Sequence, residues 1–291
     1  MAARPLIQRL CIIGVGLIGG SLARALREAG AVGEVIGAGR NEENLRAAIR
    51  LGVVDRYYTD PVDAVAGADV VVMAVPLGAM EPVLRAIAPH LAPGCVVTDV
   101  GSAKGSVVAD VERVYGYMSP NFVPGHPIAG TEKSGVEASF ARLFQKRRVI
   151  LTPRAETTAV AHHLVRRMWE LTGAEVVDMD VRHHDAVLAA TSHLPHMLAY
   201  TLVDTLARLD DRAEIFRYAA GGFRDFTRIA SSDPRMWHDI CVANREQLLK
   251  MIELFGADLE RLVAAIRNDD RAAILATFER AKAARDNLYL D

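Results

Sequence analysis

Short apolar runs alternate with helical patterns through the first three-fifths of the chain. The runs are rich in valine and isoleucine and predict strands at Leu10–Ile13, Val35–Ala38, Val70–Val75, Val96–Asp99, Phe122–Val123, Val149–Leu151 and Val176–Met179. The segments between them predict helices, such as Leu22–Ala29, Glu43–Leu51, Ala79–His90, Ser106–Tyr115 and Thr158–Leu171. Continuous runs of this kind, separated by helices, are typical of a parallel sheet that helices cover on both faces. We therefore predict an α/β fold with a doubly wound sheet.

The pattern changes near Asp180, and from Arg182 onward it is helical almost throughout. The segment His184–Leu209 is apolar around its circumference, and such a helix should be buried. The helical region is too small to enclose it alone, so we predict burial in a subunit interface. Pro195 lies inside this segment and should kink the backbone. We predict two domains, residues 1–180 with the sheet and residues 181–291 as an all-helical domain that forms a homodimer.

Charge and cysteine content narrow the class of protein. The 291 residues carry a formal net charge of −2, from 34 basic and 36 acidic side chains, which gives no sign of a nucleic-acid partner. The three cysteines are widely spaced and form no C-x-x-C pair, which favours a reduced, cytoplasmic protein without disulfides. No stretch has the length of a membrane span or the pattern of a signal peptide, so we expect no membrane association.

A glycine-rich segment follows the first predicted strand and opens the first predicted helix. It reads Gly14-Val15-Gly16-Leu17-Ile18-Gly19, the G-x-G-x-x-G spacing of dinucleotide-binding loops. Glycines there allow a tight turn and let a pyrophosphate lie on the helix N-terminus. The motif alone is weak, but its place between a strand and a helix favours a cofactor site over a simple turn. Gly14, Gly16, Leu17, Ile18 and Gly19 are its candidate contacts.

The second predicted strand indicates which dinucleotide binds. NAD-binding domains usually carry an acidic residue at the end of this strand for the ribose 2′-hydroxyl. Here the strand ends Gly37-Ala38-Gly39-Arg40-Asn41, and Glu34 lies at its other end. Arg40 stands where a guanidinium could pair with a 2′-phosphate, although it could also be a solvated surface residue. We expect NAD(P), with NADP or dual use favoured.

Further polar residues close strands on the same edge of the predicted sheet. Val75-Pro76 and Gly101-Ser102 follow two strands, and His126 follows a third, within the glycine-bounded loop Gly125–Gly135. A histidine there is a candidate general base, because it exchanges a proton near neutral pH. Ser102 could orient the nicotinamide or hydrogen-bond the histidine, and Val75 and Pro76 are further candidate cofactor contacts. The alternatives are a helix-capping serine and a histidine that only closes a turn.

Four blocks in this order resemble the prephenate dehydrogenase family, which includes arogenate and cyclohexadienyl dehydrogenases of tyrosine biosynthesis. They are Thr98–Gly105, Gly125–Gly135, Ser192-His193-Leu194-Pro195-His196, and Gly221–Ala230 continuing to Trp237. The resemblance implies a Rossmann-type sheet, a helical dimerisation domain and oxidative decarboxylation of prephenate with hydride transfer to NAD(P). It requires no metal.

The resemblance also assigns roles to residues of this chain. The catalytic histidine of the family falls on His126, its orienting serine on Ser102 and its substrate-binding arginine on Arg228. Other substrate positions fall on Glu132, His184, His193 and His196, and the partner subunit's closing segment corresponds to Gly221 and Trp237. Phe223, Phe226 and Ile229 flank Arg228, so we expect it to be partly buried and to bind a carboxylate.

Several alternatives stay open beside these assignments. Arg228 could be a helix surface residue, His193 and His196 could be core histidines, and Trp237 could be core. The loop Leu143–Arg148 has no acidic residue, which in the family favours prephenate, or both substrates, over arogenate alone. A β-hydroxyacid dehydrogenase or imine reductase would carry a catalytic lysine in the helical half, where only Lys250 and Lys282 occur. A nucleotide-sensing protein without turnover would not need His126, Ser102 and Arg228 together.

Overall fold

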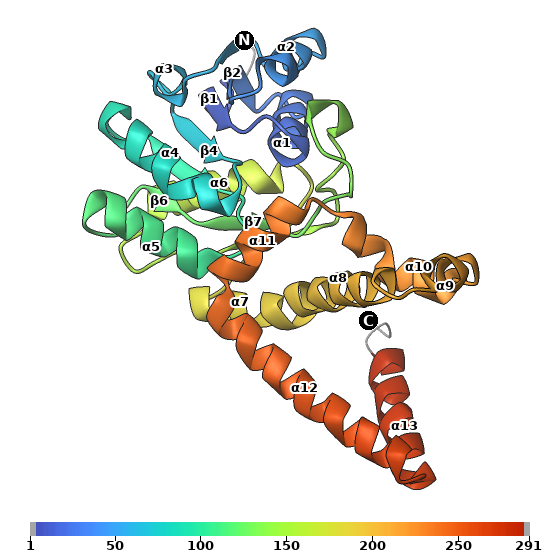
Figure 1. Ribbon diagram of the computed structural model, residues 1–291. Helices are drawn as coiled ribbons and strands as arrows, with labels where there is room; N and C mark the ends of the chain where they lie inside the picture. Colours follow the sequence, from blue (N-terminus) through green and yellow to red (C-terminus); the bar gives the residue numbers. More distant parts are fainter. Residues whose placement is uncertain (1–3, 288–291) are drawn as a thin grey trace. The chain divides into compact units, whose positions relative to one another are not determined.

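Six parallel strands form one sheet in the order β3-β2-β1-β4-β5-β6, in a computed structural model that describes residues 4–287 (Figure 1). The strands are β1 (Ile7–Ile13), β2 (Val32–Ala38), β3 (Arg56–Tyr58), β4 (Val70–Met73), β5 (Val96–Asp99) and β6 (Phe122–Val123). The strand order reverses between β1 and β4, and ligands bind at such a switch point, beyond the carboxyl ends of the strands. The predicted doubly wound fold is confirmed.

Helices cover both faces of this sheet, as the alternation of side chains along each strand requires. On β1, Leu10 and Ile12 point into one core, whereas Cys11 and Ile13 point into the other. The first core is closed by helices α1 (Leu17–Glu28), α2 (Glu42–Arg50) and α6 (Ala159–Glu170). The second is closed by α3 (Pro61–Ala64), α4 (Met80–Ile87) and α5 (Lys104–Tyr115).

A second, three-stranded sheet contains β7 (Gly125–Pro127), β8 (Arg148–Leu151) and β9 (Glu175–Asp178). The prediction of one continuous parallel sheet is therefore wrong at its end, because β7 runs antiparallel to β8. We expected His126 in a loop, and it lies in β7. Pro124 precedes this short strand and Pro127 ends it. Because proline is disfavoured in strands, residue propensities do not predict a strand here.

Among the described residues, the chain beyond β9 is helical, as expected. The elements are α7 (Val181–Leu188), a π turn (Ala189–His193), α8 (Leu194–Ala207), α9 (Arg212–Arg217), α10 (Gly221–Thr227), a 3-10 turn (Arg228–Ser231), α11 (Pro234–Ala243), α12 (Arg245–Arg267) and α13 (Arg271–Asn287). Pro195 stands at the start of α8, directly after the π turn, so the wider turn lies where the helix lacks the Pro195 N–H. Within α8 only Leu194 and Ala199 are buried in the single chain, so most of its apolar surface stays partly exposed.

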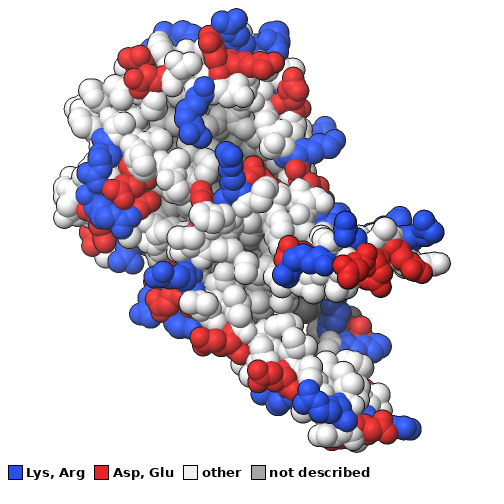
Figure 2. All heavy atoms as spheres, in the orientation of Figure 1, with Lys and Arg blue, Asp and Glu red and all other residues white. Residues whose placement is uncertain are grey.

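The chain separates into two compact units, one reaching to Arg245 and one beginning at Glu246. No helix in the described range is long and apolar enough to cross a membrane. On the face drawn in Figure 2, acidic and basic side chains are interspersed rather than gathered by sign, in line with the balanced composition.

Candidate active site

The candidate residues of the first half gather at one edge of the large sheet. Gly14 follows β1, Val75 and Pro76 follow β4, and Ser102 comes shortly after β5. Because β1, β4 and β5 are parallel neighbours, their carboxyl ends meet at the same edge. The edge therefore brings the glycine loop and the Ser102 segment together.

The glycine loop has the geometry of a dinucleotide site. Gly14 has a positive φ of 99°, and a Cβ there would lie 2.2 Å from the Ala74 carbonyl oxygen. A Cβ on Gly19 would lie 2.5 Å from the carbonyl oxygen of Gly14, whereas one on Gly16 would meet nothing within 4 Å. Gly16 also caps α1 without any side-chain hydrogen bond. The first N–H groups of α1, at Leu17 and Ile18, thus face open space beside Gly16, which fits a pyrophosphate.

The residues that bear on cofactor type are placed as the sequence suggested. Arg40 lies just after β2 and is exposed, with no hydrogen bond or ion pair to the described residues. Glu34, at the other end of β2, is paired with Arg9 at 2.9 Å and with Arg56 at 2.7 Å. Its carboxylate is therefore already engaged, far along the strand from the glycine loop.

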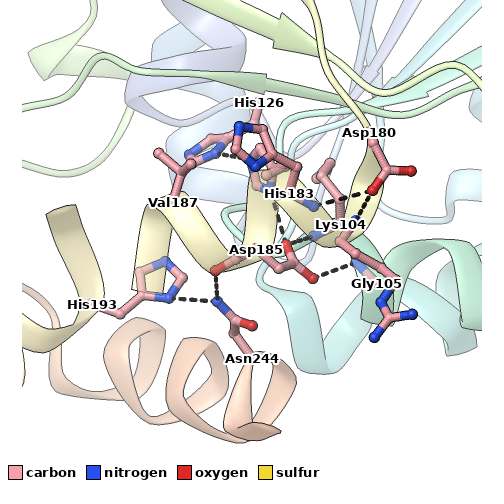
Figure 3. Close-up of polar contacts among 12 residues, drawn as sticks. Lys104, Gly105, His126, Asp180, His183, Asp185, Val187, His193 and Asn244 are labelled. Carbon is pink, nitrogen blue, oxygen red and sulfur yellow. Dashed lines mark hydrogen bonds and ion pairs between the residues drawn. The ribbon is translucent and has the colours of Figure 1, made fainter. Parts of the chain in front are cut away.

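A chain of hydrogen bonds runs back from His126 into the helical half. His126 Nδ1 lies 2.9 Å from His184 Nε2, and His184 Nδ1 lies 2.8 Å from Asp185 Oδ1. The Asp185 carboxylate also accepts the backbone N–H groups of Lys104 and Gly105, each at 2.8 Å (Figure 3). His184 is fully buried, and its contact with a substrate stays a prediction.

Burial and hydrogen bonds set the charge states of His126, His184 and Asp185. Burial lowers the pKa of His126 well below its usual value, and the charges of His184 and Lys104 act in the same direction. Burial also lowers the pKa of His184, against the opposing effect of Asp185. Burial acts to raise the pKa of Asp185, but hydrogen bonds from His184 and from two backbone N–H groups together hold it below its usual value. Both histidines are thus neutral and Asp185 is ionised near pH 7.

A buried ion pair supports the same region. Lys104 Nζ pairs with Asp99, and both side chains are fully buried. Lys104 Nζ also donates to the Gly125 carbonyl oxygen at 2.7 Å. The other contacts of the Asp99 carboxylate are the N–H groups of Gly101, at 2.7 Å, and of Gly125, at 3.1 Å. The pair therefore ties the Gly101–Ser102 turn to the strand that carries His126.

His193 and Asn244 lie next to the hydrogen bonds that join His126, His184 and Asp185. The Asn244 side-chain amide lies 3.1 Å from His193 Nδ1 and donates to the Asp185 carbonyl oxygen at 2.8 Å (Figure 3). Burial lowers the pKa of His193 to about 4, while the nearby Ser102 backbone acts in the opposite direction. His193 Nε2 is buried without a hydrogen-bond partner in the described part of the chain. The Ser102 side chain itself makes no hydrogen bond to His126 there.

Trp237 packs on the histidines of its own chain. Its ring stacks on His196, with centroids 3.6 Å apart, and lies edge-on to His193 at 6.1 Å. Its indole Nε1 is buried and unpartnered among residues 4–287. Gly221, at the start of α10, is exposed.

Arg228 differs from the expectation of partial burial. Its side chain is 63% exposed in the single chain and pairs with the carboxylate of Glu132. The apolar neighbours cited for burial do not cover it, since Phe226 is itself 45% exposed. Glu132 belongs to the segment after β7, so the ion pair links Arg228 to the loop that follows His126.

Sequence reasoning missed four residues of this site: Asp99, Lys104, Asp185 and Asn244. A signal existed for the first two, because Asp99 ends a strand that a parallel sheet buries, and a buried carboxylate needs a partner. Asp185 and Asn244 act through contacts between segments far apart in the chain, and no spacing in the sequence reveals those. Within the described range, no group of three or more His, Cys, Asp or Glu side chains is arranged to hold a metal ion.

A dinucleotide loop at the edge of the large sheet, a buried, neutral histidine in the adjoining strand β7 and a helical half after them define a dinucleotide-dependent oxidoreductase. Residues 22–178 match the family model for the nucleotide-binding domain of prephenate dehydrogenase, and residues 180–280 match the model for its dimerization domain. The chain belongs to the prephenate dehydrogenase family.

Similar proteins span almost the whole chain. Cyclohexadienyl dehydrogenase of Zymomonas mobilis is 41% identical over 289 residues, covering 98% of this chain and 97% of that protein. Prephenate dehydrogenase of Bacillus subtilis is 34% identical, over 97% of this chain and 76% of its own length. The crystal structure of Aquifex aeolicus prephenate dehydrogenase with hydroxyphenyl propionate and NAD+ matches with a TM-score of 0.90, at 38% identity over 99% of this chain and 100% of that one.

Proposed function

We propose that this protein catalyses the oxidative decarboxylation of prephenate to 4-hydroxyphenylpyruvate, with NAD(P) as hydride acceptor. The observation that carries the proposal is His126, held neutral in β7, where the neighbouring Gly125 donates its N–H to Asp99 at the carboxyl end of β5. A neutral imidazole can accept a hydroxyl proton, whereas a protonated one cannot. Membership of the prephenate dehydrogenase family supports this reaction, and the position of His126 supports its role as the proton acceptor.

In this mechanism His126 accepts the proton of the ring 4-hydroxyl. A bound nicotinamide cofactor supplies the acceptor for the hydride that leaves C4. Loss of the ring carboxylate as carbon dioxide makes the ring aromatic and leaves the electron pair on the 4-oxygen. His126 then returns its proton to that oxygen, because the overall reaction releases no net proton. Ser102 would hydrogen-bond the same oxygen from the end of β5.

Arg228 is the proposed clamp for a substrate carboxylate. Its guanidinium is exposed and paired with Glu132, so a substrate carboxylate would exchange places with that side chain. Among residues 4–287, His193 Nε2 and the Trp237 Nε1 donor are buried without a hydrogen-bond partner, which supports a place for polar ligand atoms beside them. His196 supports the Trp237 ring by stacking.

Replacing His126 by Asn tests this proposal. We expect kcat to fall by roughly 10²- to 10⁴-fold, as for loss of a general base, while cofactor binding stays unchanged. The control is His90→Asn, an exposed histidine beyond α4. Turnover is followed by absorbance of the reduced cofactor, and cofactor affinity by fluorescence titration. Retained turnover in His126→Asn would remove the residue from the mechanism.

For the cofactor, we propose NADP or dual use. The support is the exposed, unpaired Arg40 beyond β2 and the engagement of Glu34 by two arginines. In Arg40→Gln, we expect the KM for NADP to rise about 10-fold or more and the KM for NAD to stay the same, as for a lost charged hydrogen bond. Arg50→Gln, at the opposite end of α2, is the matched control. A wild-type protein that strongly prefers NAD would contradict the proposal.

Arogenate is the second candidate substrate, alone or beside prephenate. The relative that supports it is the cyclohexadienyl dehydrogenase at 41% identity. An assay with each substrate in turn, at saturating NAD and NADP, separates the cases by their kcat/KM values.

We also propose a cytoplasmic homodimer joined through the helical half. The dimerization-domain match and the half-exposed apolar surface of α8 support the dimer, and three free cysteines fit a reducing compartment. In the dimer, the segment from Gly221 to Trp237 would help to close the partner's site. Light scattering after gel filtration measures the assembly, and a monomer at micromolar concentration would contradict it.

A further inference from the structure

The hydrogen-bond chain behind His126 ends on a carboxylate that the proposed reaction does not use. Given the proton-accepting role proposed for His126, we infer that Asp185 and His184 are positioning residues that set the tautomer of His126. The same carboxylate holds the Ser102 segment in place. The three side chains come from β7 and α7, and their contacts are the bonds of 2.9 and 2.8 Å described above.

The tautomers follow from the hydrogen bonds, starting at Asp185. Its oxygens accept two backbone N–H groups of α5 and therefore act as acceptors toward His184 as well. His184 Nδ1 must then carry a proton, and neutral His184 has its lone pair on Nε2. That nitrogen faces His126 Nδ1, which must be the donor. The lone pair of neutral His126 is thereby fixed on Nε2, the nitrogen left free for substrate.

The same chain can take up the proton that His126 gains. When Nε2 accepts the hydroxyl proton, Nδ1 can pass its own proton to His184 Nε2. The resulting His184 imidazolium lies directly against the Asp185 carboxylate. The reverse transfer restores the starting state, so no other reactant is needed. The other charged or titratable groups that act on these rings are Lys104, Asp99 and His193.

Asp185 also acts on the serine segment. The N-cap of α5 is Ala103, whose side chain cannot cap, and Asp185 accepts the first two helical N–H groups instead. Ser102 directly precedes this cap. One carboxylate from α7 therefore fixes two segments that carry proposed catalytic groups.

A merely structural cap and a tautomer-setting residue respond differently to asparagine. Asn caps a helix about as well as Asp. In Asp185→Asn, however, an NH₂ group at the Oδ1 position would face both His184 Nδ1 and the Lys104 N–H, so it would reverse both tautomers and put a proton on His126 Nε2, while the oxygen keeps the Gly105 N–H. In either orientation of the amide, the negative charge beside His184 is lost. We expect kcat to fall on the order of 10²- to 10⁴-fold, by analogy with loss of an orienting carboxylate. The KM should change little, and the thermal midpoint should fall by no more than the loss of one capping hydrogen bond implies, because one α5 N–H group then faces an NH₂ group.

The matched control is Asp180→Asn on the same helix. The Asp180 side chain caps α7 by accepting the N–H groups of Arg182 and His183, and it is the backbone oxygen of Asp180, unchanged in the variant, that accepts the His184 N–H. We expect its kcat to stay within about twofold of wild type, because a cap exchange alone costs little. Nitrogen-15 NMR of labelled histidine should show protonated Nδ1 on His126 in wild type and protonated Nε2 in Asp185→Asn.

A second pair of variants applies if Asp185→Asn does not fold. The side-chain oxygen of His184→Gln can still accept from His126 Nδ1, whereas His184→Phe cannot, so Gln should retain more turnover than Phe. Equal activity in the two would overturn the inference, as would wild-type kcat in folded Asp185→Asn. If His126→Asn is inactive while Asp185→Asn is unaffected, only the positioning role fails. If both are active, the proposed function of His126 fails.

Discussion

Replacing Lys104 by Met should destabilise the protein far more than loss of an exposed ion pair would. Lys104 and Asp99 are both fully buried, so the substitution leaves a buried carboxylate without its cation. Breaking a buried pair from one side costs about 3–5 kcal/mol. The lower end applies here, because Asp99 keeps the N–H groups of Gly101 and Gly125, although the Gly125 oxygen loses its donor.

At about 2–4 °C per kcal/mol for a domain of this size, the lower-end cost of about 3 kcal/mol should lower the melting temperature of Lys104→Met by roughly 6–12 °C. Circular dichroism during heating measures it. Lys250→Met is the control, since Lys250 forms an exposed i,i+4 pair with Glu246 that is worth only about 0.3–0.5 kcal/mol. The double variant Asp99→Asn/Lys104→Met removes both charges and should recover part of the loss. A shift as small as that of Lys250→Met would refute the reasoning, because it would mean that the pair is not buried in solution.

Three further predictions follow from the charge states and the glycine loop. Because burial lowers the pKa of His126 well below 6.5, kcat should stay level from pH 8 to pH 6.5 and fall only at lower pH; an acidic limb centred above 6.5 would contradict this. His193 has a pKa of about 4 in the folded protein, so below pH 6.5 the unfolded chain binds more protons than the folded one. The free energy of unfolding therefore falls as the pH is lowered from 6.5 to about 4. The loss is about 1.4 kcal/mol per pH unit between these values, and urea titrations should show it reduced in His193→Asn. Gly16→Ala should keep the melting temperature but weaken cofactor binding, whereas Gly19→Ala should lower both, since only Gly19 lacks room for a Cβ; equal stability losses would contradict the difference.

The sequence predicted the large sheet well, because its central strands are buried on both faces and are rich in valine and isoleucine. Val96–Asp99 and Phe122–Val123 were predicted with the bounds that the structure has. The edge strand Arg56–Tyr58 was missed, since three residues without an apolar run give no periodic signal. β7 was missed for the same reason and because prolines flank it.

The site was predicted in part. Local motifs located the glycine loop, Ser102 and His126, since each depends on residues adjacent in sequence. The partial burial expected for Arg228 was wrong in the single chain, because aromatic neighbours in sequence need not cover a side chain in space. The link from His126 through His184 to Asp185 spans about 60 residues, and only the fold brings its ends together.

The charges around His126 indicate how α7, in the helical half, would take part in the proposed proton transfer. Lys104 and Asp99 cancel each other, so Asp185 leaves one uncompensated negative charge beside the histidine pair. In the resting state, backbone N–H groups at the start of α5 stabilise that charge. In the proposed mechanism His126 accepts a proton, and the new positive charge would arise in a buried site, where an isolated cation is costly. The Asp185 carboxylate is then the counter-ion, separated by one imidazole ring, and the site becomes neutral as a whole. A sheet edge without α7 would bind the cofactor but would have to protonate its buried histidine without compensation.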